Sequence, residues 1–129
     1  MAIPTQHRRQ LPEGSYLSIG QDSVLTIYPP EQWAQLASRL NQPLLNPEQR
    51  AVARALFSKA QACEFDAQGR VSLNAEIRRL AAIEPRSGAV VVGRGAQVEI
   101  WAEQRWDGYM ADTDGQFDAY TDRMIEERG

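Results

Sequence analysis

The hydrophobic positions of this 129-residue chain fall into short runs, most of which have the spacing of a strand or of a helix. Apolar and β-branched residues at 16–19 and 24–28, separated by the polar segment 20–23, predict a β-hairpin. After two prolines the period becomes helical, with one apolar stripe formed by Trp33, Leu36, Ala37 and Leu40. The first third of the chain therefore predicts a hairpin followed by an amphipathic helix.

A second helix is predicted from Pro47 to about Ala60. Asn46 is a suitable N-cap, and proline is favoured at the first helical position. Its expected inner face consists of Val52, Leu56 and Ala60. Arg50 and Arg54 are four residues apart and repel each other unless anions or a partner's carboxylates lie opposite, so this face is either exposed or an interface.

Further strands and helices are predicted in the second half of the chain. Residues 63–65 and 70–73 indicate two strands joined by the turn 66–69, and residues 89–92 and 98–101 indicate another hairpin. Between them a short helix begins at Asn74, with an inner face formed by Ile77, Leu80 and Ala81. An aromatic patch follows, and then an acidic terminal helix whose apolar side carries Phe117, Tyr120 and Met124.

The chain contains an internal repeat, which indicates two half-domains. Residues 20–33 align with residues 93–106 at a constant offset of 73, which matches Leu25 with Val98, Ile27 with Ile100, Tyr28 with Trp101 and Trp33 with Trp106. Further upstream an offset of 70 matches Ile3 with Leu73, Arg8 with Arg78 and Arg9 with Arg79. The matched aromatic residues are expected in the core, packed across the axis that relates the two halves.

Composition and charge place the chain among globular proteins with a mildly basic body. It is 43% hydrophobic and 24% charged, and no apolar run approaches the length of a membrane span. Residues 1–102 hold 11 Lys and Arg against 9 Asp and Glu, whereas residues 103–129 hold 3 against 8. The net charge of −3 therefore comes from the acidic end of the chain, and the rest of the chain has a small basic surplus. All cations but Lys59 are arginines, which suit bidentate phosphate contacts.

Few residues are suited to catalysis or to metal binding. The single cysteine, Cys63, and the single histidine, His7, cannot form a zinc set, and nothing in the sequence places them together. The acidic residues around Gly115 do not follow the spacing of a calcium loop. Neither an enzyme nor a cofactor site is expected, and the absence of a signal-peptide pattern after Met1 predicts a cytoplasmic protein.

Several segments together resemble one family. AIPTQHRR at 2–9, LTIYPPEQW at 25–33, NPEQRAVARALFSKA at 46–60, DAQGR at 66–70 and VEIWAEQRW at 98–106 are similar, in this order, to the MraZ proteins. The resemblance implies an α+β fold in which two tandem SpoVT-AbrB halves form a pseudo-two-fold, swapped-hairpin β-barrel with flanking helices. The family normally has a leading strand and a first D-x-K-G-R turn before the position of Met1, so either Met1 is an internal methionine of a longer protein or this chain is a shortened variant whose first half lacks both.

The resemblance further implies a domain plan and a function. Residues 1–45 and 62–106 would be the two halves, 46–61 a linking helix and 107–129 an acidic helical tail. The protein would be a nucleoid-associated transcriptional regulator that forms an oligomer, expected to be a ring, on double-stranded DNA repeats in the promoter of the division and cell-wall gene cluster. No membrane, cofactor or small-molecule substrate is implied. The alternative is an AbrB-fold interaction or assembly module, antitoxin-like or truncated, that does not bind DNA.

The candidate DNA-binding residues lie on one turn and on two repeated arginine pairs. Asp66 and Gly69 are expected to shape the turn, through backbone hydrogen bonds and a positive φ, so that Arg70 is presented outward. In MraZ-like proteins the residue matching Arg70 would meet DNA, although an Asp66–Arg70 ion pair could instead only fasten the turn. The other candidates are Arg8, Arg9, Arg78 and Arg79, which either contact successive phosphates or form solvated helix faces.

Overall fold

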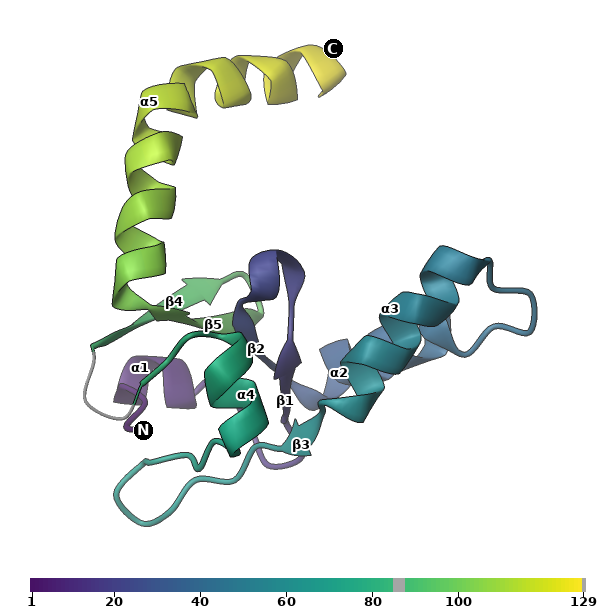
Figure 1. Ribbon diagram of the computed structural model, residues 1–129, viewed down its shortest axis with the longest axis vertical. Coiled ribbons are helices and arrows are strands. Elements are labelled where there is room, and N and C mark those ends of the chain that lie inside the picture. The colour runs from purple at the N-terminus through teal and green to yellow at the C-terminus, as the bar shows by residue number, and fades with distance from the viewer. Residues whose placement is uncertain (85–87, 129) are drawn as a thin grey trace.

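The computed structural model describes residues 1–84 and 88–128 and has the α+β architecture that the sequence predicts (Figure 1). The helices are α1 (Thr5–Arg8), α2 (Pro30–Leu40), α3 (Pro47–Ser58), α4 (Ala75–Leu80) and α5 (Glu103–Arg128). The strands are β1 (Tyr16–Ile19), β2 (Leu25–Tyr28), β3 (Gln61–Ala62), β4 (Ala89–Arg94) and β5 (Gln97–Ala102). A short 3-10 turn (Gln21–Ser23) joins β1 to β2.

The described strands form one open antiparallel sheet in the order β3-β1-β2-β5-β4. This sheet does not close into the expected swapped-hairpin barrel, because β3 and β4 remain at its two edges. The segments that were expected to form strands at 63–65 and 70–73 make only isolated bridges, which join Phe65 to Val71 and Arg70 to Ala2. They add a small three-segment ribbon beside the main sheet.

The internal repeat is confirmed by the way the two halves pair. In the β2–β5 ladder Thr26 lies opposite Glu99, and these two residues are equivalent at the offset of 73. In the ribbon Met1 and Val71, equivalent at the offset of 70, exchange both backbone hydrogen bonds, with N–H to C=O distances of 2.9 and 2.7 Å. When equivalent residues face one another in an antiparallel pair, a two-fold axis passes between them. The chain is therefore built around an internal pseudo-two-fold axis.

The core centres on the three inner strands of the sheet, β1, β2 and β5. Leu17, Leu25, Ile27, Val98 and Ile100 are fully buried. Short segments from both halves complete the cluster, including Ile3, Leu73 and Ile77. Each half thus supplies matching positions to one shared core.

Helices α2 and α3 form an arm that projects from the sheet (Figure 1). Asn46 caps α3 as expected, and its side chain and that of Gln49 form a reciprocal capping box. Leu56 is buried, and its carbonyl accepts a hydrogen bond of 2.7 Å from the Ser18 hydroxyl on β1. The expectation that Val52 lies on the inner face is wrong, because this side chain is 54% exposed.

The matched aromatic residues pack within each half and not across the axis. In the first half Trp33 stacks on Tyr16 and contacts Tyr28, with centroid distances of 5.0 and 5.5 Å. In the second half Trp101 contacts Trp106 and Tyr109 at 5.4 and 5.0 Å. The aromatic residues therefore fasten the first turns of α2 and α5 to the preceding strands, and the prediction of cross-axis packing is wrong.

Helix α5 starts directly after β5 and changes direction about halfway along (Figure 1). Its outer half extends away from the sheet and leaves a row of apolar side chains exposed, namely Phe117, Tyr120, Met124 and Ile125. Gly129, the last residue of the predicted acidic tail, is outside the described residues. In the described part of the chain, no helix combines the length and the apolar character that crossing a bilayer requires.

Candidate nucleic-acid interface

The Asp66–Arg70 turn is held by hydrogen bonds from the backbone to one carboxylate. The Asp66 side chain accepts from the N–H groups of Gln68 and Arg70 at 2.8 and 2.9 Å. The Gly69 N–H donates to the Asp66 carbonyl at 3.0 Å, and the Asp66 N–H donates to the Arg70 carbonyl at 2.9 Å. Because both the side chain and the backbone of Asp66 bond to the backbone of residues 68–70, the backbone conformation at Arg70 is fixed.

These hydrogen bonds change the acidity of Asp66. The bond from the Arg70 N–H is the largest cause that lowers the pKa of this carboxyl, and the Gln68 N–H adds to it. Both donors favour the charged form of the carboxyl. Asp66 is thus ionised in its structural role.

Gly69 has a backbone conformation that a residue with a side chain adopts only with strain. Its φ is +76°, in the left-handed region, and the residue is buried. A Cβ placed there would overlap the guanidinium group of Arg8, whose Nε lies 2.8 Å from the Cβ position. Arg8 therefore packs directly on the turn that presents Arg70.

Arg70 itself is exposed. It faces Ala2 across an antiparallel bridge, and the flanking bonds run from the Ile3 N–H to the Gly69 carbonyl and from the Val71 N–H to the Met1 carbonyl. The start of the chain thus supports the turn from the side opposite Asp66. The position of Arg70 combines a rigid backbone with a guanidinium group open to solvent.

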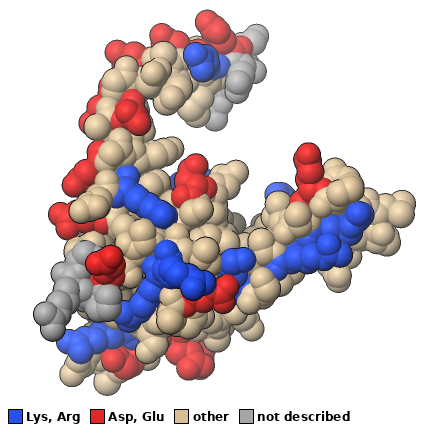
Figure 2. All heavy atoms as spheres, in the orientation of Figure 1, with Lys and Arg blue, Asp and Glu red and all other residues tan. Residues whose placement is uncertain are grey.

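The two repeated arginine pairs divide into inner and outer members. Arg8 and Arg78 are half-buried: the Arg8 Nη2 donates to the Thr5 hydroxyl at 2.8 Å, and the Arg78 Nε donates to the Leu73 carbonyl at 3.1 Å. Arg9 and Arg79 are exposed. Cations extend from α4 toward the edge where the Asp66–Arg70 turn lies (Figures 1 and 2). The outer members are thus free to meet anions, whereas the inner members contact their own chain.

Cations also follow the α2–α3 arm (Figure 2). Arg50 and Arg54 on α3 are exposed, and the Arg50 Nη1 donates to the Leu45 carbonyl at 2.7 Å. No acidic side chain forms an ion pair with either of them in the described part of the chain. This face is separate from the turn and was predicted to be either exposed or an interface.

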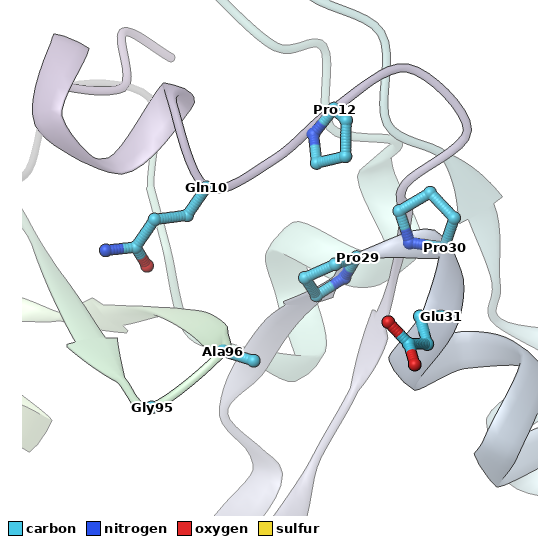
Figure 3. Close-up of a pocket in the computed structure, with 7 residues that line it drawn as sticks. All are labelled: Gln10, Pro12, Pro29, Pro30, Glu31, Gly95 and Ala96. Atoms are coloured by element: carbon cyan, nitrogen blue, oxygen red, sulfur yellow. The ribbon is translucent and has the colours of Figure 1, made fainter.

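The hollow in Figure 3 lies where the loop before β1, the start of α2 and the β4–β5 turn meet. Its lining is Gln10, Pro12, Pro29, Pro30, Glu31, Gly95 and Ala96. Glu31 is the only ionisable side chain among these residues. A single exposed carboxylate among prolines provides no acid–base pair, so this hollow is not a candidate for catalysis.

His7 and Cys63 have different surroundings. Cys63 is buried beside Ser15, and burial raises the pKa of its thiol to about 11, so the thiol stays neutral. The His7 ring lies next to Gly93 in the β4–β5 hairpin. Across residues 1–84 and 88–128 no three His, Cys, Asp or Glu side chains gather in a way that could hold a metal ion.

Two features of the structure were not predicted from the sequence. Arg94 forms an ion pair of 3.1 Å with Glu99, which also accepts a hydrogen bond from the Trp101 indole. Opposite charges on facing strands of the predicted hairpin were the available signal. Helix α1 was also missed, although its alignment with α4 at the offset of 70 could have indicated it.

Comparisons with known proteins agree with the two-half architecture of the chain. The family model described as "MraZ protein, putative antitoxin-like" matches twice, over residues 1–55 and 56–128. A protein named transcriptional regulator MraZ from Alkaliphilus oremlandii is 36% identical over 127 residues, which are 98% of this chain and 87% of the relative. Proteins of the same name from Moorella thermoacetica and Heliobacterium modesticaldum are each 34% identical, over 98% and 96% of this chain and 87% and 86% of the relatives.

Proposed function

Because this chain belongs to the MraZ family, we propose that it is a transcriptional regulator that binds double-stranded DNA through the Asp66–Arg70 turn. The observation that carries the proposal is an exposed arginine on a rigid turn. Asp66 holds that turn from one side, and Arg8 packs against it at Gly69. A guanidinium group held in this way loses little freedom on meeting a phosphate or a guanine edge.

Arg9 and Arg79 extend the proposed DNA contact. They are exposed and equivalent about the pseudo-two-fold axis, so they offer two matched positive points to the phosphate backbone. Arg8 and Arg78 act mainly by supporting their own segments. The acidic α5 extends away from the turn, which keeps most of its carboxylates from the DNA (Figures 1 and 2).

Oligomerisation is the second part of the proposal. A ring would place several Arg70 turns on successive promoter repeats, so that weak single contacts add through effective concentration. The proposed target is the promoter of the division and cell-wall gene cluster, which would place the protein at the nucleoid. In this plan residues 1–45 and 62–106 are the two AbrB-like halves, 46–61 link them and 107–129 form the acidic tail.

One observation favours a second candidate function. The apolar row on the outer half of α5 is exposed and suits contact with protein. The alternative is therefore an interaction or assembly module that does not bind DNA. The two candidates differ in their prediction for Arg70: a DNA-binding regulator needs its guanidinium group for DNA affinity, whereas an assembly module does not.

The test is fluorescence anisotropy with DNA from upstream of the gene and with scrambled DNA of the same length. The wild-type protein is compared with Arg70→Ala and with Arg39→Ala, which removes an exposed arginine from the end of α2. We expect specific binding for wild type and Arg39→Ala, and a loss of at least tenfold for Arg70→Ala. Equal specific binding by all three proteins would show that Arg70 is not the DNA contact, and no binding by any of them, with assemblies intact by light scattering, would favour the assembly module.

A further inference from the structure

The outer half of α5 carries its exposed apolar row beside a border of carboxylates. The members of the row are between 48% and 65% exposed, namely Phe117, Tyr120, Met124 and Ile125. Asp114 and Asp118 are exposed and lie one helical turn apart along one border of the row. Along the other border Arg123 lies over the Tyr120 ring, 5.9 Å from its centroid. This half of α5 therefore offers an apolar surface with an acidic edge.

The acidic edge has no counter-charge in its own chain. In the part of the chain that the structure describes, neither Asp114 nor Asp118 has an ion-pair partner. Like charges four residues apart on a helix repel each other, so cations placed opposite them would relieve the repulsion. An exposed apolar surface of this kind typically marks contact with another protein. The surface that fits it is both apolar and basic.

The α2–α3 arm has such a surface. Arg50 and Arg54 on α3 are exposed and have the same four-residue spacing as the two carboxylates. Phe57 lies next to them on the helix and is 39% exposed, and Leu44, in the loop at the tip of the arm, is 93% exposed. Residues 30–60 hold four Lys and Arg against two Asp and Glu. The arm is thus apolar and basic where the outer half of α5 is apolar and acidic.

The spacing of the charges also matches. Residues four apart on any α-helix are about 6 Å apart along its axis, so Asp114 and Asp118 can face Arg50 and Arg54 when the two helices lie side by side. Arginine and carboxylate form the stronger kind of hydrogen bond, in which both partners are charged. Two α5 helices side by side would instead bring carboxylates together, and two arms would bring arginines together. Charge therefore favours α5 against an arm.

Within one chain the two surfaces do not meet. The hairpins β1–β2 and β4–β5 are equivalent about the pseudo-two-fold axis, since Leu17 pairs with Ile27 as Val91 pairs with Ile100. Helices α2 and α5 follow these hairpins and so leave the sheet from two separate places. The outer half of α5 and the arm do not touch in Figures 1 and 2. The arm that α5 can reach therefore belongs to another copy of the chain.

We propose that the outer half of α5 of one copy docks on the α2–α3 arm of a second copy. The apolar row of α5 packs on Phe57 and Leu44, and Asp114 and Asp118 face Arg50 and Arg54. Because the contact joins two different surfaces, each copy has one of each free, and repetition gives a closed ring when the rotation closes. The inference rests on the oligomer of the proposed function and names the surfaces that join its copies.

The experiment is sedimentation velocity of the full chain with two charge-reversed variants. The arm variant carries Arg50→Glu and Arg54→Glu, and the helix variant carries Asp114→Arg and Asp118→Arg. Each alone brings like charges together, so we expect at least tenfold weaker association than in wild type. An equimolar mixture should regain the wild-type mass, because each changed surface fits the changed surface of the other variant. The control is Val52→Glu, which puts an acid on the opposite, exposed face of α3 and should assemble like wild type.

The outcomes separate this inference from the proposed oligomer. If wild type assembles but the charge variants assemble equally well, or their mixture stays dissociated, the inference is overturned and other surfaces join the copies. A wild type that stays monomeric at every concentration would contradict both.

A milder pair of variants makes the test independent of how well the charge-reversed chains fold. A chain with Arg54→Cys and a chain with Asp118→Cys, mixed with a short bis-maleimide, should be joined to each other. Replacing Arg54→Cys by Val52→Cys should abolish the product, and the buried Cys63 should not react. Failure to join the Arg54→Cys and Asp118→Cys chains in an assembled sample would overturn the inference.

Discussion

The two halves of the molecule share a sequence pattern and an axis, yet they differ in how completely they are closed. In the first half, Leu17 and Ser15 are at most 1% exposed. In the other half, their equivalents Val91 and Ala89 are half-buried beside a hollow. The same strand pattern therefore gives a sealed core only where the next segment covers the edge, which is also where the rigid turn lies.

The largest expected effect is a difference in stability between equivalent strand positions. Leu17→Ala removes a fully buried side chain and should cost about 2–5 kcal/mol in the free energy of unfolding. Val91→Ala, at the half-buried equivalent, should cost about 1 kcal/mol. Urea denaturation followed by circular dichroism measures both. Equal losses would show that the two edges are closed to the same degree.

The next effect separates two glycines that both have positive φ. Gly69→Ala should cost about 1–3 kcal/mol, since φ is unfavourable and the new Cβ meets the Arg8 guanidinium. Gly95→Ala, in the β4–β5 turn, has open space around its Cβ and should cost about 1 kcal/mol from its backbone alone. Thermal denaturation compares them, and adding Arg8→Ala should relieve only the Gly69 variant. If Arg8→Ala restores stability to both glycine variants, or to neither, the contact between Arg8 and Gly69 does not explain the cost of Gly69→Ala.

A smaller effect should appear in the pH dependence of stability. The pKa of Asp66 is lowered in the folded state, so its contribution is present above the ordinary Asp range and is lost as the pH falls through the lowered value. Asp66→Asn keeps an acceptor oxygen but does not titrate. The stability gap between wild type and variant, from urea midpoints at several pH values, should therefore narrow toward acid. A gap that stays constant with pH would exclude this role of the carboxylate.

The smallest effect concerns the ion pair that only the second hairpin has. Arg94 is 59% exposed at its side chain, so solvent screens its attraction to Glu99. Arg94→Ala should cost at most about 0.5 kcal/mol at low salt and nothing measurable at high salt. Urea midpoints at two salt concentrations measure this difference. A large loss that persists in high salt would indicate that Arg94 has a further partner.

Much of the fold could be predicted because local signals and the repeat agree. The Asn46 cap and the helical spacing around Trp33 place α3 and α2 correctly, and the offset of 73 predicts that Thr26 and Glu99 are equivalent. The burial of Val52 was predicted wrongly. The helical period predicts which residues share one face of α3, but it does not predict how far along the helix that face is covered. Because the α2–α3 arm projects from the sheet, only the base of the arm packs against it.

Less of the candidate interface could be predicted. The turn chemistry of Asp66 and Gly69 can be read locally, because both act on neighbouring backbone. The packing of Arg8 on Gly69 joins residues 61 positions apart and has no local signal. For the same reason the sequence did not distinguish half-buried Arg8 and Arg78 from exposed Arg9 and Arg79.

The central claim is that the rigid turn presents Arg70 to DNA, and the most direct test is the salt dependence of binding to the upstream DNA. Removing one arginine that neutralises a phosphate should reduce the slope of log K against log salt by about 1. Arg70→Ala should therefore bind more weakly and with a shallower slope if Arg70 meets a phosphate, or with an unchanged slope but weaker sequence preference if it meets a base. Arg39→Ala should match wild type. An Arg70→Ala protein with wild-type affinity, slope and preference would contradict the account.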